Sequence, residues 1–420
     1  MTDDARSSPE LRPVQERRLP QELLRHAQTL RGKRDPQIVY DQIRALTPIW
    51  RDEDSGMWYV FRWSDVSELL RSPAFGAPGL IQRSPRFATS SSLQFLADTL
   101  SNIDPPHHTH LRSQIQRSFS QPVLKRSAAY RDSVIQKVID GLRDRDSFDV
   151  VADYAALIPN TVICELLGVP RADHVRFGGW LAAQFRLLSP VPPTDALLDE
   201  IDGATTALVD YMAELIEIKR QAPQEDIISE LVRLQPQLEE PMTIREMIVT
   251  STILLAGGSD TTKTAISMGV RSLLENPEQC ARLVADPSLD QSMFEEVLRT
   301  GGAVLLSNPR KALKDTQLAG QNIGAGEFVV PVLVAANHDP DRFPAPMSFD
   351  IGRKPNLHVA FGGGVHACVG NMLARAVGTS AIATLLRAFP DLKMLDDGRD
   401  VATDLVALRG LKSLRVSMRA

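Results

Sequence analysis

A single thiol stands on a glycine-rich loop that leads into a helix, within the stretch Phe361-Gly362-Gly363-Gly364-Val365-His366-Ala367-Cys368-Val369-Gly370. The stretch has the form F-G-x-G-x-H-x-C-x-G, and residues 369–375 after it are typical of a helix start. Glycines lack side chains, so this loop lets the backbone pass close to a flat, bulky group. Its N–H groups and the positive end of the helix dipole face the sulfur, and we expect Cys368 to ionise easily.

A thiolate on such a loop is a suitable axial ligand for haem iron, because it donates electron density to the metal and favours cleavage of an O–O bond. The stretch resembles the haem-binding signature of the cytochrome P450 family, the haem-thiolate monooxygenases, at every fixed position. The resemblance implies haem b, iron protoporphyrin IX, as the cofactor and Cys368 as the axial ligand of its iron. It also implies that Phe361, His366 and Gly370 contact this haem.

Two adjacent glycines interrupt the middle of a second, long helical pattern. The pattern opens with a capping box, Thr243 with Glu246, and runs to Glu275. A helix of about 32 residues is about 48 Å long and can cross the centre of a domain. Within it, Gly257 and Gly258 each cost about 1 kcal/mol relative to alanine. They indicate that another group approaches the helix closely, or that its hydrogen-bond ladder opens there.

Asp260 and Thr261 follow this glycine pair. The segment resembles the P450 central-helix motif, (Ala/Gly)-Gly-x-(Asp/Glu)-Thr, in which the glycines border the oxygen pocket above the haem. The resemblance implies that Thr261 hydrogen-bonds to iron-bound dioxygen and that Asp260 supplies protons toward it, as scission of the O–O bond requires. Without the cysteine motif, a helix-packing Gly-Gly beside an exposed Asp-Thr would explain the segment equally well.

Further charged residues match the family pattern. Glu296 and Arg299, three residues apart on one helix, resemble its E-x-x-R pair, which joins the helix to the loop near the thiolate and has a structural role. Alone, such a spacing is typical of a weak surface ion pair. The resemblance also implies a set of cations and donors for the two haem propionates: His108, Arg112, Arg310 and His366.

Composition excludes several classes of protein. The 420 residues are 43% hydrophobic and 24% charged, with a net charge of −5, which favours a soluble globular protein and argues against nucleic-acid binding. The three cysteines, Cys164, Cys280 and Cys368, are too few for a disulfide framework. We therefore expect a cytoplasmic location. The first residues lack a signal-peptide pattern and no stretch of about 18 apolar residues occurs, which predicts no membrane anchor.

The predicted fold is mainly α with small β-sheets (α+β), the single-domain cytochrome P450 fold. Residues 1–20 are polar and form a flexible lead, and residues 21–420 form one haem-binding domain. Helical periodicity dominates residues 105–300, whereas residues 72–104 show no clean period and are predicted to be irregular. A helix capped by Ser64 and short strands are also expected, the strands at residues 58–63, 327–334 and 414–416.

The resemblance implies an enzyme that inserts one oxygen atom from O2 into a C–H or C=C bond of an apolar, natural-product substrate. Its electrons come from a ferredoxin and a ferredoxin reductase, and we expect a monomer. One alternative uses the same haem oxidant for oxidative coupling, desaturation or rearrangement without net oxygen insertion. A second alternative, from another class, is a haem-binding sensor without turnover, which would not require Asp260 and Thr261.

Pocket and docking residues are expected by analogy with the family. The substrate pocket is assigned to residues 76–103, 177–198, 304–308 and 406–411. Basic residues on the cysteine face are candidate contacts for an acidic ferredoxin: Arg112, Arg117, Lys125 and Arg126. Departures from the family pattern are His338 in place of arginine, Ala376 in place of an acid, and Gly301-Gly302, which puts the shape of the pocket in question.

Overall fold

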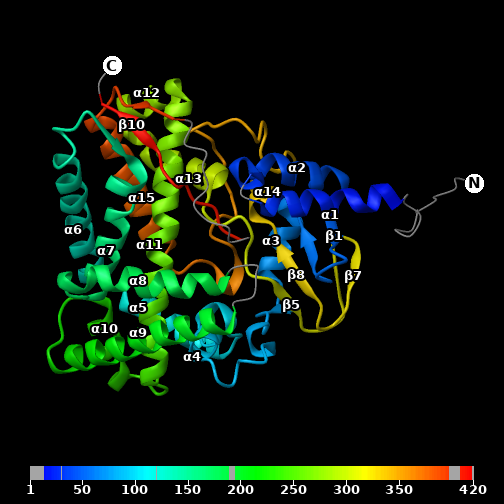
Figure 1. Cartoon of the computed structure of the whole chain (residues 1–420), viewed down its shortest axis with the longest axis horizontal. Helices are drawn as coiled ribbons and strands as arrows, with labels where there is room; N and C mark the ends of the chain where they lie inside the picture. The colour runs from blue at the N-terminus through cyan, green and yellow to red at the C-terminus, as the bar shows by residue number, and fades with distance from the viewer. Residues whose placement is uncertain (1–13, 30, 120, 189–193, 397–406, 419–420) are drawn as a thin grey trace, which may run out of the picture.

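The computed structural model describes residues 14–29, 31–119, 121–188, 194–396 and 407–418. A large helical body lies beside a smaller part that contains the main sheet (Figure 1). The helices are α1 (Val14–Gln28), α2 (Pro36–Leu46), α3 (Trp63–Arg71), α4 (Ser91–Ala97), α5 (His107–Ser118), α6 (Gln121–Asp140), α7 (Leu157–Leu167), α8 (His174–Phe185), α9 (Asp195–Gln221), α10 (Ile227–Leu234), α11 (Ile244–Glu275), α12 (Pro277–Ala285), α13 (Asp290–Gly301), α14 (Leu333–Asn337) and α15 (Asn371–Ala388). The prediction of a mainly α fold with small sheets is confirmed.

The strands are short and form three small sheets. They are β1 (Ile49–Arg51), β2 (Trp58–Val60), β3 (Phe75–Gly76), β4 (Ser147–Asp149), β5 (Arg310–Ala312), β6 (Thr316–Leu318), β7 (Gln321–Ile323), β8 (Phe328–Pro331), β9 (Lys393–Met394) and β10 (Arg415–Ser417). The largest sheet has the order β1-β2-β8-β5-β3, with β2 and β8 parallel. The other two join β4, β10 and β9, and β6 with β7. The main sheet therefore unites strands from residues 49–76 with strands from residues 310–331.

The long helix α11 is the centre of the helical body (Figure 1). Its capping box is present, with Thr243 Oγ1 accepting from Glu246 N and the Glu246 carboxylate accepting from Thr243 N, so the predicted start and length are confirmed. The helix packs against α7, α9, α13 and α15. Gly378 lets α15 and α13 lie close together, because a Cβ there would come within 2.1 Å of the Phe294 ring. This close packing fixes α15, and with it the loop that carries Cys368.

Several predicted boundaries are wrong. Helix α1 begins at Val14, inside the lead predicted for residues 1–20, because Leu24 and Ala27 on α1 are buried and α1 packs on α2; residues 1–13 lie outside the described part of the chain. Helix α3 begins at Trp63 rather than after Ser64, with Arg62 at the cap and no side-chain cap bond. Residues 72–104 are not wholly irregular, since they include β3 and α4.

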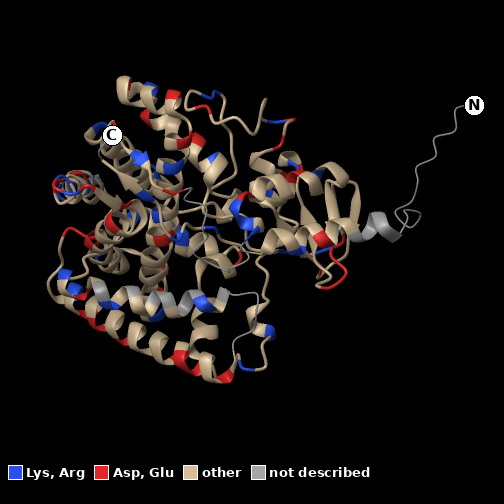
Figure 2. Ribbon diagram, turned by 45° about the horizontal axis from the view of Figure 1, so that its top comes forward, with Lys and Arg blue, Asp and Glu red and all other residues tan. Residues whose placement is uncertain are grey.

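Charge is spread over the surface with both signs interspersed (Figure 2). Among the described residues, one helical segment, residues 150–167, is long and apolar enough to cross a membrane, and 61% of it is buried inside the fold. Buried side chains such as Tyr154, Ile158 and Leu167 show that this segment belongs to the core of the helical body.

Candidate active site

The loop that carries Cys368 is held in place by backbone hydrogen bonds. Cys368 N donates to Phe361 O at 2.9 Å, and the side chain of Asn371, the first residue of α15, donates to Cys368 O at 2.7 Å. Gly364 has a φ of 64°, and a Cβ there would lie 2.1 Å from Leu70 O on α3. Glycine is therefore required at this position, and the loop is fixed between α3 and α15.

Cys368 lines a cavity of about 330 Å³ together with residues of α11. A Cβ added at Gly257, Gly362 or Gly370 would meet no atom within 4 Å, so these glycines open onto free space. Gly258 also lines the cavity, but a Cβ there would come within 3.1 Å of Ile163 on α7, so this glycine serves close helix packing as well. A flat, largely apolar group fits a cavity with such walls.

Thr261 lines this cavity from α11, and its Oγ1 donates to Gly257 O at 2.7 Å. The side chain of Asp260, one residue before it, makes an ion pair with Lys263 Nζ at 2.5 Å on the same helix. Asp260 is not among the described residues that line the cavity. The structure thus brings Thr261 and Cys368 to one cavity, whereas the carboxylate of Asp260 pairs with Lys263.

The four predicted propionate ligands gather around Asp104. The rings of His108 and His366 meet edge to face with centroids 4.5 Å apart, and none of their four ring nitrogens has a hydrogen-bond partner of normal geometry among the described residues. Burial lowers the pKa of Arg310, and Asp104 acts in the opposite direction. Burial, then Arg310, lowers the pKa of His366 to about 3.

Arg112 belongs to the same cluster. Burial has the largest effect on the pKa of His108 and lowers it, and the charge of Arg112 lowers that pKa further. Asp104 provides a carboxylate to this cluster, and its Oδ1 lies 4.0 Å from His366 Nε2. Unsatisfied buried donors beside an excess of positive charge favour an anion. The donor set therefore fits the two carboxylates of haem.

The expected easy ionisation of Cys368 is wrong for the protein chain by itself. Burial raises the pKa of its thiol, and the Gly370 N–H, Arg112 and Arg375 oppose that effect only in part. Among the groups that lower this pKa, the backbone N–H of Gly370 has the largest effect, but the effect of burial is larger. A metal cation deprotonates a thiol that coordinates it, so ionisation would accompany ligation.

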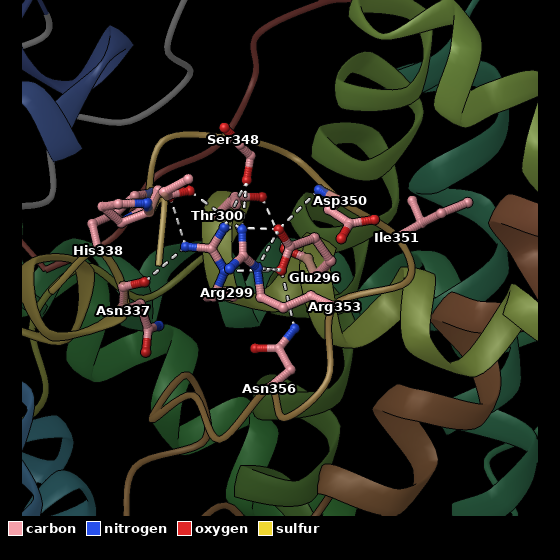
Figure 3. A network of polar contacts seen from close by, with 12 residues as sticks. Glu296, Arg299, Thr300, Asn337, His338, Ser348, Asp350, Ile351, Arg353 and Asn356 are labelled. Atoms are coloured by element: carbon pink, nitrogen blue, oxygen red, sulfur yellow. Dashed lines mark hydrogen bonds and ion pairs between the residues drawn. The ribbon is translucent and has the colours of Figure 1, made fainter. Parts of the chain in front are cut away.

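Glu296 and Arg299 are completely buried, so they do not form a surface ion pair. Arg299 Nε and Nη2 donate one hydrogen bond to each carboxylate oxygen of Glu296, at 2.8 and 2.7 Å. Arg299 also donates to the carbonyl oxygens of Asn337, Pro346 and Ser348 (Figure 3). The network joins α13 to residues 337–350, which lead toward the cysteine loop.

Sequence reasoning missed two further members of this network. Arg353 Nε donates to both carboxylate oxygens of Glu296, at 3.1 and 3.2 Å, and Asn356 Nδ2 donates to Oε2 at 3.0 Å (Figure 3). No spacing in the sequence indicates these contacts, because residues 353–356 lie about sixty positions from Glu296 and approach it only in the fold.

The predicted substrate stretches contribute unequally to the cavity. Val304 and Ser307 line it, as does Gly302 from the unusual Gly301-Gly302 pair. None of residues 76–103 or 407–411 lines it, nor do those of 177–198 whose side chains the structure describes, and residues 189–193 and 406 lie outside the described part of the chain. His338 is buried, and its Nδ1 lies 2.9 Å from Val334 O, so this departure from the family pattern is accommodated in the core.

A model of the cytochrome P450 family matches residues 79–286 and 287–407, most of the chain. The chain belongs to the cytochrome P450 family. As a P450 it is similar to the P450 monooxygenase PikC of Streptomyces venezuelae, at 33% identity over 92% of this chain and 91% of that protein. It is equally similar to the vitamin D(3) 25-hydroxylase of Pseudonocardia autotrophica, at 33% identity over 91% of this chain and 94% of that protein.

Solved P450 structures have the same fold. The myxobacterial P450 CYP267B1 in complex with myristic acid is 33% identical, covers 94% of this chain and 99% of its own, and has a TM-score of 0.85. P450BioI in complex with a fatty-acid-ligated acyl carrier protein is 28% identical, covers 92% and 99%, and also has a TM-score of 0.85. This P450 is a monooxygenase with haem b as its cofactor, and it requires O2, a small-molecule substrate and a redox partner.

Proposed function

We propose that this P450 inserts one oxygen atom from O2 into a C–H or C=C bond of an apolar substrate, at a haem whose iron is ligated by Cys368. The observation that carries the proposal is that Cys368 and Thr261, which come from the cysteine loop and from α11, line the same cavity. A haem-thiolate centre supplies the cleavage of the O–O bond.

The residues around the haem have separate tasks. Phe361, Gly370, Gly257 and Gly258 form walls that let a flat group approach the backbone. The cations and donors that hold the propionates are His108, Arg112, Arg310 and His366. The positive charges of Arg112 and Arg310 offset the cost of bringing two carboxylates out of water.

Thr261 and Asp260 are the proton-handling pair. The Thr261 hydroxyl, which donates to Gly257 O, is held in one orientation at the cavity wall. From there the hydroxyl can stabilise a proton or a water molecule beside the O–O bond that is to be cleaved. Asp260, which pairs with Lys263, is partly exposed and can exchange protons with solvent. The pair therefore connects solvent to the cavity.

The substrate is an apolar natural product or fatty acid. The cavity side chains that come from α11 and from the segment after α13 include the aliphatic groups of Ile253, Leu254 and Val304. Relatives support this class, since one is named for vitamin D(3) and two solved structures hold fatty acids. Oxidative coupling, desaturation and rearrangement use the same residues, and the pose of the substrate decides between these outcomes and oxygen insertion.

Oxygen consumption tests the function directly. With a surrogate ferredoxin, its reductase and NAD(P)H, we expect the holoenzyme to consume O2 and to add one atom of 18O from 18O2 to a fatty-acid substrate. A sensor without turnover would consume none. An oxidised product without 18O would assign the enzyme to coupling, desaturation or rearrangement instead.

Thr261→Ala provides the sharper test of the proton-handling pair. Loss of the hydroxyl should lower the yield of product per NAD(P)H by about tenfold or more and release hydrogen peroxide, because general acid–base groups contribute factors of this order. Thr264→Ala, one turn later on α11, is the matched control and should stay coupled. Normal coupling in the Thr261→Ala protein would remove Thr261 from the mechanism.

We propose a ferredoxin as electron donor to a monomeric, cytoplasmic protein. Of the predicted docking residues, Arg117 and Lys125 are exposed, whereas Arg126 contacts Glu165 at 3.3 Å and Arg112 belongs to the propionate cluster. The double substitution of Arg117 and Lys125 by glutamate should lower the rate of reduction about tenfold at low salt and less at high salt. Lys314→Glu, a substitution on the loop before β6, is the control and should leave the rate of reduction unchanged. Equal rates in both variants would contradict docking at α5 and α6.

A further inference from the structure

A polar groove of about 770 Å³ lies between α13 and α15, next to the loop that carries Cys368. Glu295 is the one carboxylate among the described residues that line it, and three of the lining cations are Arg353, Lys354 and Arg375. The Glu295 carboxylate binds Arg375 with both oxygens, at 2.6 and 3.1 Å. Glu295 is next to Glu296 in the sequence, but it makes none of the contacts of the buried Glu296–Arg299 pair.

Glu295 is also held by a histidine. His358 Nε2 lies 3.0 Å from Glu295 Oε2, and His358 Nδ1 accepts from Ala360 N at 3.2 Å. These contacts assign the proton to Nε2, which donates to the carboxylate. Burial alone would raise the pKa of Glu295, but the bonds from His358 and Arg375 outweigh it and lower that pKa to about 2. Glu295 is therefore ionised at neutral pH.

Arg375 connects this network to the cysteine loop. Its guanidinium carbon lies 4.6 Å from the centroid of the Phe361 ring, and Phe361 O accepts the hydrogen bond of Cys368 N. The charge of Arg375 acts on Cys368 and lowers the pKa of its thiol, against the larger effect of burial. Glu295 thus holds the guanidinium of Arg375 against Phe361, the residue whose carbonyl oxygen accepts the hydrogen bond from Cys368 N.

We propose that Glu295 is a positioning residue that fixes Arg375 on Phe361, and that this ion pair sets the reduction potential of the haem iron behind Cys368. The inference rests on the proposed ligation by Cys368. Reduction of ferric to ferrous iron adds one negative charge to the centre, so a nearby cation favours it and a nearby anion opposes it. The side chains of Arg375 and Glu295 are 39% and 27% exposed, so salt screens part of this effect.

The experiment is a redox titration of the substrate-free holoenzyme, with dithionite as the electron donor and dye mediators. In the Glu295→Gln protein, which keeps an acceptor for Arg375, we expect the ferrous-to-ferric ratio at a fixed potential to rise about tenfold, a shift of about 59 mV. In the Arg375→Gln protein the ratio should fall by a similar factor. Both shifts should be larger at low salt. Glu278→Gln, which removes an exposed carboxylate at the start of α12, is the control and should leave the ratio unchanged.

Opposite shifts in the two variants support the inference, since a merely structural pair would give shifts of one sign or none. Shifts of the same sign, or no shift, in variants whose reduced carbon monoxide complex still absorbs at about 450 nm would overturn it while leaving the proposed function intact. If the unsubstituted protein lacks that band, both the ligation by Cys368 and this inference are wrong.

Discussion

Replacement of Cys368 by serine will abolish the absorption band at about 450 nm that the reduced carbon monoxide complex of the unsubstituted protein should show. The band requires a thiolate opposite carbon monoxide, and a serine hydroxyl has a much higher pKa and donates less electron density. The loop itself should survive, because the bond from Cys368 N to Phe361 O and the bond from Asn371 to Cys368 O involve the backbone of residue 368. Substrate oxidation should fall by about a thousandfold or more, as when other groups that act directly in the chemistry are removed.

Cys280→Ser is the matched control. Cys280 lies on α12 and is partly exposed, and it does not line the cavity, so the band at about 450 nm should remain. Far-ultraviolet circular dichroism and haem content measured on both variants will separate a lost ligand from a lost fold. A Cys368→Ser protein that retains the band would show that another group ligates the iron.

Motifs with fixed spacing indicated residues that the structure places around one cavity. The cysteine loop belongs to one short sequence motif, and Gly257, Gly258 and Thr261 belong to another. Residues of both motifs line one cavity in the structure. The length of α11 could be predicted because its start and end carry local signals, the capping box at Thr243 and the Asn276-Pro277 sequence. In each case the information is local.

Contacts between distant segments could not be predicted. Arg353 and Asn356 reach Glu296 from about sixty residues away, and Arg375 reaches Glu295 from 80 residues away. Helix α4 was missed because its short sequence has no clear period; Ser90 caps it, and Asp202 on α9 accepts hydrogen bonds from Ser90 and Ser92. Such elements depend on tertiary contacts more than on local propensity.

The ionisation of Cys368 was misjudged for a related reason. A loop before a helix predicts a low thiol pKa from the dipole and the N–H groups, but it does not reveal which groups from distant parts of the chain surround the sulfur. In the structure burial is the largest effect on that pKa, and it acts in the opposite direction. The residues around a group can be predicted from a motif, whereas its desolvation follows from the whole fold.

Replacement of Glu296 by alanine should lower the free energy of unfolding by about 3–5 kcal/mol, because it leaves buried charges without a counter-charge. One carboxylate serves two guanidinium groups here, since Glu296 accepts from both Arg299 and Arg353 (Figure 3). Arg299 is completely buried, and its other acceptors are the backbone carbonyl oxygens of Asn337, Pro346 and Ser348. These neutral groups cannot replace a carboxylate, and the two cations would then repel each other.

Glu230→Ala is a control with the same spacing, because Glu230 pairs with Arg233 three residues later on α10, where that arginine is 39% exposed. Its loss should cost under about 1 kcal/mol. Denaturant unfolding gives both values, and the haem content of each variant shows whether residues 337–356 still hold the cysteine loop. Equal stabilities for the two variants would mean that water or a rearranged side chain compensates Arg299. In that case the polar network would not be what fixes this loop, and the close packing of Gly378 against Phe294 would have to hold α15 in place.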